Sequence, residues 1–169
     1  MATDGIRTTL ERAGLAQYVG RDHDQVFTAI VNALAPAGAS TEEAAARHAA
    51  AEVLEELYAK FAVDAGGLER LDAMTAEDVR TAIELSIARY IYHRWLGELS
   101  QRLEEKSVSA AQAERLEREM KAYVGEIVQL DLGNVNVLQL DWSGPQGSRV
   151  LEDLYEQAYG VLGTSGESI

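Results

Sequence analysis

The side chains with the widest chemical range in this sequence are three histidines, His23, His48 and His93. His48 and Glu52 are four residues apart, so on a helix they would face the same side and could share a metal ion. Two ligands do not make a metal site, however. The sequence contains no HExxH motif, no paired Glu-x-x-His motifs and no aspartate-rich calcium loop. We therefore expect no metal centre.

Other catalytic patterns are also missing from the sequence. No serine lies in a Gly-x-Ser-x-Gly elbow, and no glycine-rich turn with a Walker lysine could hold phosphate. Acidic pairs such as Glu55-Glu56 and Glu104-Glu105 are typical of solvated helix faces. These observations predict a protein that is not an enzyme, with no catalytic residues and no cofactor.

The most aromatic and basic stretch is Arg89-Tyr90-Ile91-Tyr92-His93-Arg94-Trp95. We interpret it as an end of a long central helix, where amphipathic side chains reach the surface, and prefer this interpretation to a ligand pocket. A second apolar series lies in a stretch rich in glycine and asparagine and consists of Leu132, Val135, Val137, Leu138, Leu140 and Trp142. Either that stretch folds back over the helices or it presents an edge to another protein. The candidate interaction residues are Tyr92, His93, Trp95, Leu140 and Trp142.

The element that must position the aromatic stretch is a long helix predicted from Thr75 to about Leu103. One stripe along it repeats every four residues, and a second stripe follows helical spacing on another face. The first stripe consists of Val79, Ile83, Ile87, Ile91 and Trp95, and the second of Leu85, Tyr92, Leu96, Leu99 and Leu103. A surface helix needs one apolar stripe, so two stripes indicate a central helix packed on both sides.

The rest of the sequence predicts an all-α, single-domain bundle of about six helices around this central helix. The other helices are expected over residues 4–18, 24–35, 40–63, 109–127 and 148–163. Ser40 with Glu43, and Ser109 with Gln112, have the spacing of capping boxes. A short irregular or extended segment, a hairpin being one alternative, is expected near residues 131–147. The domain would cover residues 1–163 and be followed by a mobile tail at 164–169.

Composition narrows the classes of partner. The net charge is −13, from 28 acidic and 15 basic residues, and Arg149 is the one lysine or arginine after Lys121. Such a surface predicts no direct binding of nucleic acid, which requires cations to neutralise phosphates. No apolar run reaches the roughly 18 residues of a membrane span, and no signal peptide is evident. With cysteine absent, these features predict a protein of the cytoplasm.

The order of landmarks resembles the helical domain of bacterial anti-phage proteins of the QatB type. The resemblance is carried by AIVNALAPAGASTEEAAARHAAAEVLEEL, by LDAMTAEDVRTAIELSIARYIYHRWLGELSQRLEEK and by LEDLYEQAYGVL, within residues 26–162. Proteins of this type are components of multi-gene defence systems. The resemblance therefore implies a bacterial defence protein with protein partners, encoded nearby, and it carries over no catalytic residue.

Together these observations predict a non-enzymatic, acidic helical interaction subunit or adaptor in a multi-protein anti-phage defence system. Two alternatives stay open: an acidic decoy that occupies a nucleic-acid-binding surface of another protein, and a small-ligand sensor that uses the neighbourhood of His93. Homo-oligomerisation also stays open, because helix faces are easily shared between chains, although no heptad array is long enough to require it.

Overall fold

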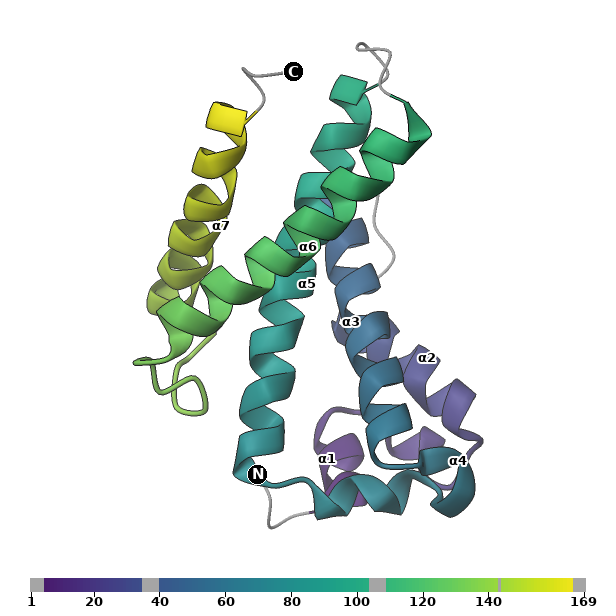
Figure 1. Cartoon of the computed structure of the whole chain (residues 1–169). Coiled ribbons are helices and arrows are strands. Elements are labelled where there is room, and N and C mark those ends of the chain that lie inside the picture. The colour runs from purple at the N-terminus through teal and green to yellow at the C-terminus, as the bar shows by residue number, and fades with distance from the viewer. Residues whose placement is uncertain (1–4, 35–39, 104–108, 143, 166–169) are drawn as a thin grey trace. The chain divides into compact units, whose positions relative to one another are not determined.

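The computed structural model describes residues 5–34, 40–103, 109–142 and 144–165 (Figure 1). Within these ranges the chain forms α-helices, 3-10 helices and irregular connections, and it contains no β-strand. The predicted all-α class is therefore confirmed. The chain divides into two compact units, Met1–Ala82 and Ile83–Ile169. One domain over residues 1–163 stays a prediction, which depends on whether the two units unfold together.

The first unit combines one long helix, α3, with several shorter elements. These are α1 (Gly5–Arg12), the 3-10 helix η1 (Ala16–Tyr18), α2 (His23–Leu34), α3 (Thr41–Lys60), α4 (Val63–Gly66), the 3-10 helix η2 (Leu68–Ala73) and the start of α5 (Ala76–Leu103). In Figure 1, α2 and α3 lie side by side as an antiparallel pair. The core of the unit is aliphatic and consists of Leu10, Leu15, Val26, Ala29, Val63, Leu68 and Leu71.

The second unit is built from three long helices. The remainder of α5 packs with α6 (Ala110–Leu132) and α7 (Pro145–Ser165) around one core, and α6 crosses α5 in Figure 1. Ile87, Ile91 and Trp95 of the predicted first stripe are buried in this core, as is Tyr92 of the second stripe. Because both predicted stripes contain buried residues, the burial pattern agrees with the prediction that α5 packs on more than one of its faces. Leu99 and Leu103 lie outside the part of the chain whose side chains are described.

The starts of the two helices with predicted capping boxes, α3 and α6, lie where the sequence predicts them. The Glu43 N–H donates to Ser40 Oγ over 3.1 Å, and the Ser40 N–H donates to Glu43 Oε2 over 3.0 Å, so two exposed amides are satisfied reciprocally. Ser109 and Gln112 form the second predicted capping box at the start of α6. Both predicted capping boxes are confirmed. They could be predicted because a capping box depends only on two residues three positions apart.

Thr75 and Asp78 play the same part before α5. Asp78 N–H donates to Thr75 Oγ1, and the Asp78 carboxylate accepts hydrogen bonds from Thr75 and from Lys60 Nζ, the latter at 2.6 Å. These hydrogen bonds, with that from Lys60 the largest cause, hold the pKa of Asp78 well below its usual range. The contact with Lys60 ties the end of α3 to the start of α5 within the first unit.

Several predicted boundaries were wrong, among them the end of α6, which continues past residue 127 to Leu132. The first helix ends at Arg12 and not near Tyr18, because Gly14 adopts a φ of +75° that breaks the helix before η1. The last helix begins at Pro145, a residue suited to a first turn because it lacks an N–H, so Ser148 lies inside the helix and its hydroxyl donates to the Gly144 carbonyl. That helix also continues past Gly163 to Ser165, and residues 166–169 of the predicted tail lie outside the described part of the chain.

The segment predicted to be irregular or extended is irregular. The two-residue alternation of apolar residues suggested extended chain, but the described residues between Gly133 and Gly144 form successive turns without a hairpin. Gln139 and Leu140 both donate backbone hydrogen bonds to the Asn136 carbonyl. Asparagine and glycine favour such turns, so turn chemistry outweighs the alternation here.

Candidate interaction surface

The interpretation of residues 89–95 as a helix end that reaches the surface was wrong, because they lie in the middle of α5 and its aromatic candidates are buried inside the second unit. Tyr92 and Trp95 are 7% and 4% exposed, and their ring centroids are 6.2 Å apart. Lys121 of α6 covers the Tyr92 ring, with Nζ 5.5 Å from the centroid. Because these rings are enclosed by their own chain, their described surroundings are those of a packed core. A binding role for them stays a prediction.

His93 lies next to this core and is half-buried. Its ring meets the Tyr92 ring edge to face at a centroid distance of 5.2 Å. Among the described residues, no group of three or more histidine, aspartate or glutamate side chains could hold a metal ion, and His48 is exposed on α3. The neighbourhood of His93 therefore offers aromatic packing, with no constellation of metal ligands around it in the described residues.

The candidates after α6 are also engaged with their own unit. The Trp142 indole N–H donates to the Val137 carbonyl over 3.0 Å, and the half-buried ring packs against the core. Val137 is 1% exposed, and Leu140 is half-buried. Trp142 and Val137 therefore follow the first of the two alternatives, in which the segment folds back over the helices. Other side chains of the same segment face outward.

Two leucines that were not among the candidates are the prominent outward residues here. Leu130 on α6 is 75% exposed and Leu138 in the following turns is 47% exposed. A signal for Leu130 exists in the sequence: Met120, Val124, Val128 and Leu132 are the buried four-residue stripe of α6. Leu130 follows Val128 by two positions, which on a helix is nearly the opposite face. The exposed leucine could thus have been recognised by its mismatch with the stripe.

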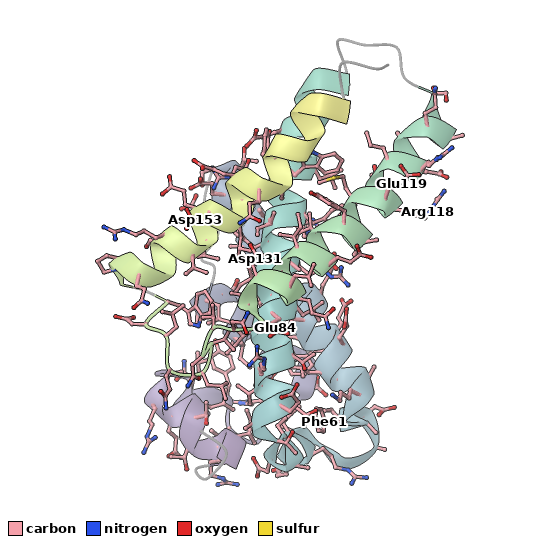
Figure 2. The ribbon with its side chains drawn as sticks, turned by 60° about the vertical axis from the view of Figure 1, so that its left-hand side comes forward. Phe61, Glu84, Arg118, Glu119, Asp131 and Asp153 are labelled. Atoms are coloured by element: carbon pink, nitrogen blue, oxygen red, sulfur yellow. The ribbon has the colours of Figure 1, made fainter. Side chains whose placement is uncertain are left out.

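Acidic side chains accompany both leucines. Glu126 is four residues before Leu130 and so lies on the same side of α6, while Asp131 follows directly; both are exposed. Asp141 is exposed three residues after Leu138. Figure 2 shows Asp131 at the end of α6 and Asp153 on α7, where it too is exposed. We call residues 126–141, with exposed leucines among carboxylates, the acidic leucine segment.

A polar cluster that sequence reasoning missed joins α5 to α7. Glu98 accepts hydrogen bonds from the hydroxyls of Tyr155, at 2.5 Å, and of Tyr159. The Arg94 guanidinium lies 3.9 Å from the centroid of the Tyr155 ring, and its Nε is 4.0 Å from Glu98. Burial, followed by the hydrogen bond to Glu98, raises the pKa of Tyr155 well above its usual range. The hydrogen bonds of Tyr155 and Tyr159 to Glu98, with the contact of Arg94 on the Tyr155 ring, hold α7 against α5.

The part of the chain that the structure describes contains no helix with an apolar stretch of the length needed to span a bilayer. Neither the comparison with curated proteins nor the comparison with solved structures gave a significant match. A family model described as "Qat anti-phage system associated protein QatB" matches residues 1–162. The match includes residues 26–162, over which the resemblance was predicted, and extends it to the first residue. The chain belongs to the QatB family of proteins associated with the Qat anti-phage system.

Proposed function

We propose that this chain is a non-enzymatic interaction subunit of a Qat anti-phage system and that it binds a protein partner through the acidic leucine segment. The observation that carries the proposal is the exposure of Leu130 and Leu138, at 75% and 47%, among the carboxylates of Glu126, Asp131 and Asp141. An adaptor needs such an outward apolar feature, because its own core side chains are already occupied.

The chemistry of the segment defines the partner. Full burial of a leucine side chain is worth about 1.5–3 kcal/mol, so two exposed leucines can supply a substantial part of a binding free energy. The carboxylates around them favour a partner that presents lysine or arginine around an apolar depression, and they disfavour acidic surfaces. A partner of that kind is the protein class that we expect.

The aromatic residues have a supporting role in this proposal. Tyr92 and Trp95 stabilise the core on which α6 packs, and Trp142 fixes the turns that carry Leu138. Truncating any of them would disturb binding indirectly, through the position of the segment. The residues that we propose to contact the partner directly are Leu130 and Leu138.

The acidic decoy remains the alternative function. In that case the carboxylates would take the place of phosphates, and the leucines would matter little. The two functions differ in their response to salt, since the Debye length falls from about 10 Å at 0.1 M to about 3 Å at 1 M. A decoy complex would dissociate in high salt and in the presence of a short DNA duplex, whereas an interface built on leucines would survive both.

The test is isolation of the tagged chain from cells that carry the complete defence system, with the eluate identified by mass spectrometry at low and at high salt. We expect a stoichiometric protein encoded in the same system, retained at high salt and not displaced by duplex DNA. Recovery of the chain alone, or as a homo-oligomer without another protein, would contradict the proposal. Displacement by DNA would replace it with the decoy.

A further inference from the structure

The first unit encloses a half-open cavity that the proposed function does not use. Its volume is about 290 Å³, and it lies between α1, the turn that follows η1 and the start of η2. This volume is near the lower end of the range of small-molecule sites, which is about 300–1,000 Å³. The cavity therefore has room for a ligand of modest size.

The floor of the cavity is apolar and firmly held. Leu10 and Leu68, 4% and 9% exposed, belong to the core of the unit and also line the cavity together with Ile6. The wall formed by α1 is fixed at its start, because the Ile6 N–H donates to the Asp72 carboxylate over 2.5 Å. An apolar ligand body would meet side chains that the fold already positions, which lowers the entropic cost of binding.

Two cations border this floor. Arg7 and Arg21 line the cavity from α1 and from the turn after η1, and both are exposed. In the described residues neither guanidinium is engaged in a hydrogen bond or an ion pair. Their donors are thus available, in a chain whose net charge is −13. Guanidinium groups form strong, charge-assisted hydrogen bonds with carboxylates and phosphates.

We propose that this cavity binds a small amphipathic organic anion. Its apolar body would lie on Ile6, Leu10 and Leu68, and its single carboxylate or phosphate would be held by Arg7 and Arg21. The carboxylates of Asp22 and Glu69 also line the cavity, so its charge is balanced and polyanions are disfavoured. The site is independent of the acidic leucine segment, which belongs to the other unit.

The test is isothermal titration calorimetry with octanoate, octyl phosphate and the uncharged octanol as probes. We expect at least one of the two anions to bind, and octanol to bind about tenfold more weakly or not at all. Arg7→Gln with Arg21→Gln should weaken anion binding by about tenfold. Arg12→Gln with Arg47→Gln removes the same two charges from the same unit, outside the cavity, and should leave binding unchanged.

A further variant tests the role of the acidic rim. Glu69→Gln should strengthen anion binding by about two- to fivefold, because a repulsive charge is removed. Preference for octanoate or for octyl phosphate identifies the ligand as a carboxylate or as a phosphate ester. Should the double arginine variant fail to fold, as judged by circular dichroism, Arg21→Gln alone and Glu69→Gln carry the test. Equal affinity for octanol, equal loss in the two double variants, or no binding of either anion would overturn the proposal.

Discussion

Each of the two units has its own apolar core, and the two cores are enclosed by different kinds of helical element. The first joins the long α3 to several shorter elements through tight turns. The positive-φ residues among those described, Gly5, Gly14, Gly20, Gly67 and Ala62, all belong to this unit. The second uses three long helices around Ile91, Trp95, Leu132 and their neighbours. In the first unit, residues of α1, of the turn after η1 and of the start of η2 line a cavity. Long helices bury continuous stripes and leave whole residues such as Leu130 outside.

This contrast separates two kinds of binding. A cavity lined by core side chains suits a small ligand, whereas an exposed leucine among carboxylates suits a protein surface. The first unit is therefore the place for the proposed anion site, and the second for the proposed docking segment. Substitutions in each unit should show how burial, turn geometry and polar contacts are distributed between the units.

The largest expected difference is between two leucines of α6. Leu132→Ala should lower the free energy of unfolding by about 3–5 kcal/mol, because Leu132 is 0% exposed and its removal leaves a cavity. Leu130→Ala should change it by less than about 0.5 kcal/mol, because that side chain is 75% exposed. Urea denaturation of both variants measures the two changes in the free energy of unfolding. Comparable losses would mean that Leu130 is buried, for example in a homo-oligomer.

The next contrast compares two glycines of α7. A Cβ at Gly147 would lie 2.5 Å from Trp142 Cα and 2.6 Å from the Asp141 carbonyl oxygen, both backbone atoms that cannot move aside easily. Gly147→Ala should therefore destabilise the protein by about 1–3 kcal/mol. At Gly160 nothing lies within 4 Å of the added Cβ, so Gly160→Ala should stabilise the helix by about 0.5–1 kcal/mol. Thermal unfolding that moved in the same direction for both variants would refute the close approach of α7 to the turns.

The polar cluster of the second unit should contribute a smaller amount. Tyr155→Phe removes the hydrogen bond to Glu98 and should cost about 0.5–1.5 kcal/mol at neutral pH. The matched change Tyr123→Phe, on α6, should cost less than about 0.5 kcal/mol, since no hydrogen bond of that hydroxyl is present among the described residues.

The same variant carries a pH dependence of known sign. Because the pKa of Tyr155 is raised in the folded protein, the stability linked to its proton is present below the unfolded value near 10 and is lost as the pH rises above it. The difference in stability between the wild type and Tyr155→Phe should therefore shrink in alkaline solution. A difference that stayed constant from pH 7 to pH 11 would show that the pKa of Tyr155 is not raised in the folded protein.

The smallest expected effect belongs to the turns of the first unit. Ala62 adopts a φ of +50°, a left-handed conformation that costs a residue with a Cβ about 1–2 kcal/mol. Ala62→Gly should release part of this strain and stabilise the protein by about 0.5–1 kcal/mol. Ala59→Gly, three residues earlier in α3, should destabilise it by a similar amount. Equal destabilisation by both glycines would show that Ala62 is not left-handed in solution.

Much of the fold could be predicted from the sequence because its signals are local. Capping boxes need residues three positions apart, and the buried stripe of α5 follows from helical spacing alone. The start of α7 was misplaced because Pro145 and Ser148 both signal a helix start, and the chain uses the earlier one. The turns after α6 were ambiguous because alternation and turn residues disagree within the same segment.

The candidate site was harder to predict, for a physical reason. Large aromatic residues such as Tyr92, Trp95 and Trp142 are equally suited to a core and to an interface, and here they are in or against the core. The contacts of Glu98 with Tyr155 and Tyr159 span 57 and 61 positions, so no local pattern reveals them. The exposure of Leu130 becomes evident when the buried stripe of α6 is known.

The most direct test of the docking proposal is the dissociation constant of the complex with the co-purified partner, measured for three forms of the chain. We expect Leu130→Ser with Leu138→Ser to weaken binding by about tenfold or more, while the folded state is retained. Leu34→Ser alters another leucine that is 70% exposed, in the first unit, and should leave the dissociation constant unchanged. An unchanged affinity in the double variant, or an equal loss in Leu34→Ser, would contradict the assignment of docking to the acidic leucine segment.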